Sequence, residues 1–131
     1  MSASDLLRSG SNSQPGVIDE EHLGRMTLGD RGLEHELLQI FVRQSATILD
    51  RITSHDTAVI AAAAHTMIGS ARGIGAWHVA RAAEQLERAV SEGNEPALVE
   101  AIAALKFASL EVNAAIEARL VDPSHHVSDC A

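Results

Sequence analysis

The sequence is poor in aromatic residues and in positive charge, and each shortage argues against a class of protein. Among its 131 residues, Phe41, Trp77 and Phe107 are the only Phe, Trp or Tyr residues. A β-sandwich core draws on β-branched and aromatic residues, and a base-stacking platform needs aromatic rings. The formal net charge of −8 also argues against a nucleic-acid binder, which requires a basic surface. We therefore expect neither a β-sandwich nor nucleic-acid binding.

Cysteine pairs and long apolar runs are missing as well. The single cysteine, Cys130, has no second cysteine with which to form an internal disulfide, which fits a reducing compartment. No apolar run approaches the roughly 20 residues of a membrane span. The N-terminus has no basic segment followed by an apolar one, as a signal peptide would have. The sequence thus predicts a cytoplasmic protein that does not bind membranes.

The residues that are abundant favour helices. The hydrophobic content is 46%, and Ala, Leu, Ile and Val supply nearly all of it, which suits helix-on-helix packing. Apolar residues recur at steps of three and four, and no segment alternates as a strand does. This periodicity predicts helices over residues 19–28, 31–53, 57–72, 76–91 and 96–120. Asp19, Asp30 and Asp56 stand where N-caps are expected.

These elements predict an all-α protein, an antiparallel four-helix bundle with an additional short N-terminal helix. The domain is expected over residues 17–120. Residues 1–16, rich in Ser and Gly, are predicted to be a disordered leader, and residues 121–131 a disordered tail. In the first two helices, the side chains expected to face inward are Ile18, Leu23, Met26, Leu33, Leu37, Ile40, Phe41, Ile48 and Ile52.

One histidine lies in a run of small residues within the third predicted helix. On a wheel of about 100° per residue, Ile60, Met67, Ala71 and Ile74 fall opposite His65, so the imidazole should point to solvent. Gly69 lies one turn further on, and a glycine inside a helix costs about 1 kcal/mol relative to alanine. A helix that accepts this cost beside an exposed histidine suggests close approach by another backbone or a partner. The remaining residues on the histidine face are Ala58, Ala61, Ala62 and Arg72.

The residues around His65 resemble a known family. The segment His65-Thr66-Met67-Ile68-Gly69-Ser70-Ala71, followed by Gly75-Ala76 and Leu86-Glu87, is similar to the motif of histidine-containing phosphotransfer (HPt) domains. The resemblance covers roughly residues 18–120, and the family fold agrees with the bundle predicted from periodicity. It implies a phosphorelay intermediate that accepts a phosphoryl group on His65 from a receiver-domain aspartate and passes it to another receiver.

The resemblance also implies the partners and the supporting residues. The expected partners are response-regulator receiver domains and a hybrid histidine kinase, and we expect the chain to be a monomer. The protein is expected to be a phosphoryl carrier without kinase activity, metal or cofactor of its own, with Mg²⁺ held by the receiver partner. Supporting roles are predicted for Gly69, Ser70, Arg72 and Gln44. The surface that meets the partner is predicted to include Ala58, Ala61, Ala62 and Ile68.

One residue departs from the family pattern. Family members usually carry lysine three residues after the histidine, where this chain has Ile68. The departure leaves Arg72, two turns along, as the nearest basic candidate, with Arg81 and Arg88 on the next helix. Two explanations stay open: weaker charge support for the phosphoryl group, or an apolar contact between Ile68 and a partner.

Three other functions were weighed. Gly69, Gly73 and Gly75 match the phosphate-binding turn of short-chain dehydrogenases, but that turn must follow a strand, and no strand is predicted. A metal-binding bundle needs inward Glu-x-x-His pairs, which are absent from the sequence. A helical adaptor that binds a receiver or kinase without carrying phosphate is the remaining alternative.

Overall fold

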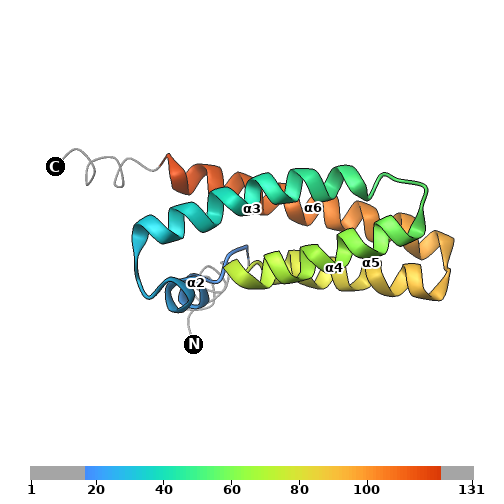
Figure 1. Ribbon diagram of the computed structural model, residues 1–131, viewed down its shortest axis with the longest axis horizontal. Helices are drawn as coiled ribbons and strands as arrows, with labels where there is room; N and C mark the ends of the chain where they lie inside the picture. The colour runs from blue at the N-terminus through green and yellow to red at the C-terminus, as the bar shows by residue number, and fades with distance from the viewer. Residues whose placement is uncertain (1–16, 122–131) are drawn as a thin grey trace, which may run out of the picture.

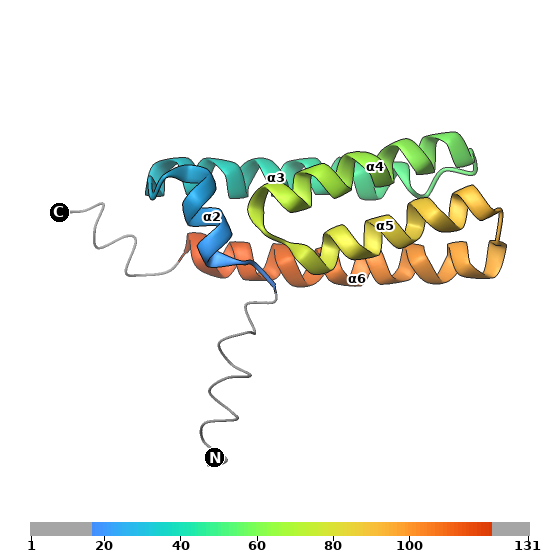
Figure 2. The ribbon, with the colours of Figure 1, turned by 90° about the horizontal axis from the view of Figure 1, so that it is seen from below.

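The computed structural model describes residues 17–121, which form five helices and no strand (Figure 1). The helices are α2 (Glu20–Thr27), α3 (Arg31–Arg51), α4 (Thr57–Ile74), α5 (Trp77–Glu92) and α6 (Glu95–Leu120). Helices α3 to α6 run up and down as an antiparallel bundle, and α2 lies across one end (Figure 2). The predicted fold class is confirmed. The predicted leader, residues 1–16, lies outside the described residues, and so does the predicted tail, residues 121–131, except for Val121.

Side-chain caps fix where the helices begin. Asp19, Asp30 and Asp56 accept hydrogen bonds from first-turn backbone N–H groups at 3.0, 3.0 and 2.9 Å. Asn94 caps α6 in the same way, at 3.1 Å from the backbone nitrogen of Ala97. Each cap pairs a donor that the helix itself leaves without a partner. Because these signals are local in the sequence, every predicted helix boundary falls within two residues of the observed one.

The four long helices surround an aliphatic core. Helix α4 packs between α3 and α5, while α6 packs against α5 and α3, so that α4 and α6 lie diagonally across the bundle. None of the helices within residues 17–121 has both the length and the apolar character needed to cross a membrane. The largest side chains that are fully buried include Phe41, Leu38, Met67, Leu86 and Leu105.

Three side chains predicted to lie in the core are at the surface instead. Met26, Leu33 and Ile40 are 53%, 40% and 38% exposed. Helix α2 covers the bundle end with only a narrow strip, Leu23 and Thr27, which leaves Met26 outside. The buried line of α3 is Leu38, Phe41, Ser45 and Ile48. Leu33 and Ile40 lie about 100° away from this line on the helix, so they are only partly covered.

A junction around Asp19 joins α2 to the turn between α4 and α5. The backbone nitrogen of Asp19 donates to the carbonyl of Gly75 at 3.0 Å, and the Trp77 indole donates to the Asp19 carboxylate at 2.9 Å. This indole bond, helped by the backbone N–H of His22, holds the pKa of the Asp19 carboxyl below its ordinary value. Gly75 adopts a left-handed φ of 77°, which ends α4 and starts the turn. The junction therefore ties α2 to the C-terminal end of the helix that carries His65.

Candidate functional site

His65 lies in the middle of α4 and faces solvent. Its side chain is 77% exposed. The opposite face of the helix is in the core, where Ile60, Met67, Ala71 and Ile74 are each no more than 3% exposed. The predicted helix phase is thus confirmed. The imidazole is open to a large partner, because only its base is covered by the bundle.

Glu87 of α5 holds the imidazole from one side. Its Oε2 lies 3.2 Å from His65 Nδ1 across the α4–α5 boundary. A carboxylate accepts but cannot donate, so the Nδ1–H tautomer satisfies this bond and places the free lone pair on Nε2. Because Glu87 belongs to α5, a helical wheel drawn for α4 alone does not place it beside His65. The Leu86-Glu87 pair of the motif was the signal that could have revealed this partner.

The predicted neighbours of His65 on its face of α4 include alanines and a glycine, whose side chains project little beside the imidazole. Ala58, Ala62 and Gly69 are exposed, and Ala61 is half-buried. A Cβ placed on Gly69 would meet nothing within 4 Å. Packing within residues 17–121 therefore does not require glycine at this position. Glycine lowers the stability of a helix relative to alanine, and no contact among the described residues accounts for it at this position.

Ser70 and Gln44 meet on the other side of the helix. The Ser70 hydroxyl donates to Gln44 Oε1 at 2.9 Å and thereby ties α4 to α3. The structure thus brings together two of the residues predicted to support the site. Side chains of both neighbouring helices thus contact α4 beside the site: Glu87 of α5 contacts His65, and Gln44 of α3 contacts Ser70.

The basic side chain expected nearest to His65 is engaged elsewhere. The Arg72 guanidinium pairs with Glu84 of α5, and the backbone carbonyl of Arg72 accepts from His22 Nε2 at 2.8 Å. The structure therefore does not place Arg72 beside the imidazole. The same α4–α5 boundary carries two carboxylates, Glu84 and Glu87, and each contacts one α4 side chain.

Ile68 does not belong to the partner surface, contrary to the prediction. It is only 8% exposed and belongs to the core. Ile68 and Arg72 are four residues apart and so lie on the same side of α4, which the Arg72–Glu84 pair shows to be the side facing α5. On a helical wheel drawn for α4 alone, Ile68 lies at the edge of the His65 face, but in the structure α5 covers this position. Its burial leaves little of the Ile68 side chain available for an apolar contact with a partner in this conformation.

Replacing Ile68 with lysine is expected to destabilise the protein. The substitution removes a buried aliphatic side chain, and the ammonium can reach solvent only by extending along the α4–α5 boundary. We expect the free energy of unfolding to fall by about 1–3 kcal/mol. Urea denaturation measures this, with Ile68→Met as the volume-conserving control, which should lose less than about 1.5 kcal/mol. Equal stability of the lysine variant and the parent would contradict the burial of Ile68.

The site thus consists of an exposed histidine on an antiparallel helical bundle, contacted by a carboxylate and surrounded by small residues. The sequence model described as "Hpt domain" matches residues 36–120, which include α4, α5, α6 and most of α3. The chain belongs to the Hpt domain family. Comparisons with curated protein sequences and with solved structures gave no significant match. Domains of this family are histidine phosphotransfer modules that interact with receiver domains in two-component phosphorelays.

Proposed function

We propose that His65 accepts a phosphoryl group from the aspartyl phosphate of one receiver domain and passes it to the aspartate of another. The observation that carries the proposal is the solvent-facing imidazole whose Nδ1 contacts Glu87 at 3.2 Å. The small residues around it support the same conclusion, since a receiver must bring its aspartate to the ring. Membership of the Hpt family supplies the class of reaction.

The reaction requires this chain mainly to position the imidazole of His65. The Nε2 lone pair of a neutral imidazole attacks phosphorus without a general base, the phosphorus–oxygen bond of the aspartyl phosphate breaks, and the receiver carboxylate leaves. Such transfers depend mainly on in-line placement and stabilisation of charge. The Nδ1 proton stays on the ring, where Glu87 stabilises the positive charge that develops as Nε2 bonds to phosphorus.

The residues at the site indicate what this chain contributes to the reaction and what the receiver must contribute. We propose that the receiver contributes Mg²⁺ and the acidic pocket, and that this chain acts as a carrier without kinase activity of its own. The carboxylates nearest to the site, Glu84 and Glu87, each contact a side chain of α4. In this proposal Glu87 orients the imidazole, and the positive charge that meets the phosphoryl group comes mainly from the partner.

Replacing Glu87 with alanine is expected to slow phosphoryl transfer roughly tenfold, the lower end of the loss seen when the carboxylate partner of a metal-ligating histidine is removed. The fold should survive, because the Glu87 side chain is 41% exposed. Transfer kinetics measure the rate, and ¹⁵N spectra of the ring should show the Nδ1–H tautomer losing population. Glu84→Ala is the matched control, since it removes the Arg72 pair on the same helix without touching His65. Equal slowing by both variants would contradict a role for Glu87 in orienting the ring.

Replacing Gly69 with alanine is expected to raise stability and to weaken binding of the receiver. Because an added Cβ meets nothing within 4 Å, the variant should gain up to about 1 kcal/mol of unfolding free energy. The same methyl group projects into the surface where the receiver approaches, so its dissociation constant should rise. Denaturation and titration calorimetry measure the two effects. A stabilised variant with unchanged receiver affinity would show that Gly69 lies outside the interface.

The test of the proposed function uses two receiver domains in sequence. A receiver carrying labelled phosphate is mixed with the chain, the carrier is purified, and the second receiver is added with Mg²⁺. We expect acid-labile, base-stable label on the carrier and then loss of that label to the second receiver. Receiver binding without any transfer of label would reject the proposal and favour the adaptor.

A further inference from the structure

The outward face of α6 carries apolar side chains that nothing within residues 17–121 covers. Val99, Phe107 and Leu110 are 67%, 66% and 65% exposed, and Ala103 and Ala114 beside them are exposed too. Apolar surface that continues along a helix in this way marks an interaction site. Because α6 lies diagonally across the bundle from α4, the face points away from His65.

Buried and exposed residues of α6 alternate with a period of seven. Written as a heptad repeat with positions a to g, α6 has Phe107 and Ala114 at a and Ala103 and Leu110 at d. Every residue at b, c or f from 101 to 119 is then buried or half-buried. Every residue at a, d or e from 100 to 118 is exposed. The inner face therefore belongs to the bundle, while the outer face repeats the pattern of a coiled-coil seam over its central residues.

We propose that a second copy of this chain covers this face, with the two α6 helices packed in parallel. Charge complementarity favours a second copy of the chain on this face and a parallel direction of the two helices. Parallel coiled-coil dimers bring a g residue against the e residue five positions later on the partner. Lys106 at g then meets Glu111 of the second copy, and the two-fold symmetry forms this pair twice. Neither residue forms an ion pair within the described part of the chain.

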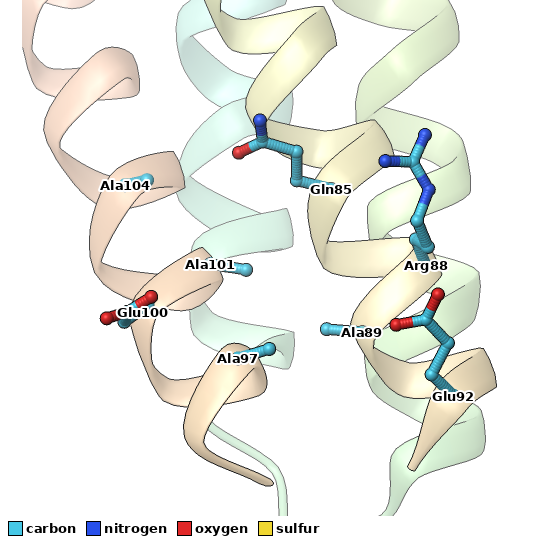
Figure 3. Close-up of a pocket in the computed structure, with 8 residues that line it drawn as sticks. All are labelled: Gln85, Arg88, Ala89, Glu92, Ala97, Glu100, Ala101 and Ala104. Atoms are coloured by element: carbon cyan, nitrogen blue, oxygen red, sulfur yellow. The ribbon is translucent and has the colours of Figure 1, made fainter. Parts of the chain in front are cut away.

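The antiparallel arrangement lacks this complementarity. There, g residues face g residues, and when Phe107 packs on Leu110 of the second copy, Lys106 lies nearest to Asn113. In the parallel arrangement the other g residues, Val99 and Asn113, face Ala104 and Ala118 of the second copy. Ala104 borders a groove between α5 and α6 (Figure 3). Four alanines line it together with the longer side chains of Gln85, Arg88, Glu92 and Glu100; the alanines are Ala89, Ala97, Ala101 and Ala104. The groove leaves room for the flank of the second helix.

The size of the seam predicts a weak dimer. At a rise of about 1.5 Å per residue, the stretch from Ala103 to Ala114 is about 17 Å long. Glu100 and Glu117 occupy the next seam positions and would meet their own copies, which limits the apolar contact to this stretch. Stable interfaces cover roughly 800 Å² on each partner, so we expect a concentration-dependent dimer in place of the monomer expected from sequence. Both copies of His65 stay accessible in it.

The first test is sedimentation equilibrium of the full chain over a concentration series. The mass should rise from 13.9 kDa toward twice that value, and Leu110→Glu should raise the dissociation constant roughly tenfold or more. Leu28→Glu is the matched control, because Leu28 is 92% exposed but lies at the end of α2. Circular dichroism confirms that each variant is folded. A chain that is monomeric at every concentration, or a dimer indifferent to Leu110→Glu, would overturn the proposal.

The second test fixes the direction of the helices. Lys106→Glu and Glu111→Lys should each raise the dissociation constant about fivefold, because each homodimer then places like charges together. An equimolar mixture of the two variants should form a heterodimer that restores both pairs and the parent affinity. A mixture no tighter than either variant would reject the parallel arrangement. If Leu110→Glu weakens binding of a receiver domain to a chain that is always monomeric, the face serves that partner and the proposal is wrong.

Discussion

The His65→Gln variant is expected to carry no acid-labile label after incubation with a phosphorylated receiver, whereas the parent chain becomes labelled. Glutamine keeps a polar side chain on the helix but has no ring nitrogen with a free lone pair to attack phosphorus. The fold should be unaffected, because the His65 side chain is 77% exposed and, among the described residues, its ring has one polar partner, Glu87. We therefore expect complete loss of phosphoryl transfer without loss of folding stability.

A matched control separates this site from the other histidines. His55, an exposed residue in the connection between α3 and α4, offers the same chemistry outside the small-residue surface, so His55→Gln should be labelled like the parent. Receiver binding by His65→Gln, measured by titration, should stay within a few-fold of the parent value. Label that persists in His65→Gln would show that another residue accepts the phosphoryl group.

Gly75→Ala is expected to be the most destabilising single change that adds one methyl group. Gly75 has a φ of 77°, which costs an alanine roughly 1–2 kcal/mol. The added Cβ would also lie 2.9 Å from the Asp19 Cβ and 3.1 Å from the Asp19 carbonyl oxygen, so the junction with α2 must shift. We expect a total loss of about 2–4 kcal/mol in unfolding free energy. The fluorescence of Trp77, the only tryptophan, reports the transition in urea.

Gly93→Ala isolates the backbone contribution. Gly93 has a similar φ of 65°, but its added Cβ would meet nothing within 4 Å. It should therefore lose only the conformational cost, roughly 1–2 kcal/mol, and the difference between the two variants measures the Asp19 contact. Equal losses in the two variants would show that the junction relaxes freely around the added methyl group.

The parts of the fold that depend on neighbours in the sequence could be predicted. The caps Asp19, Asp30 and Asp56 mark helix starts because a carboxylate and the first-turn N–H groups lie within three residues of each other. The outward direction of His65 follows from the phase of a single helix. Both inferences need only the local period of about 3.6 residues.

The errors arose where another helix decides the outcome. Ile68 is buried because α5 covers that side of α4, and Met26 is exposed because α2 meets the bundle end along a narrow strip. Glu87 reaches His65 from another helix, 22 residues further along the chain. The exposure of Phe107 likewise depends on which faces of α6 remain uncovered. Because α6 is strongly apolar, its sequence does not show which apolar residues are left exposed.

The central claim is that Nε2 of His65 carries the phosphoryl group while Glu87 holds the Nδ1 proton. The most direct measurement is a phosphorus–nitrogen correlation spectrum of the ¹⁵N-labelled chain, phosphorylated by a receiver and kept at alkaline pH, where phosphohistidine is stable. We predict one phosphorus resonance coupled to Nε2 of His65. A phosphorus resonance coupled to Nδ1, or to a nitrogen of any other histidine, would contradict the account.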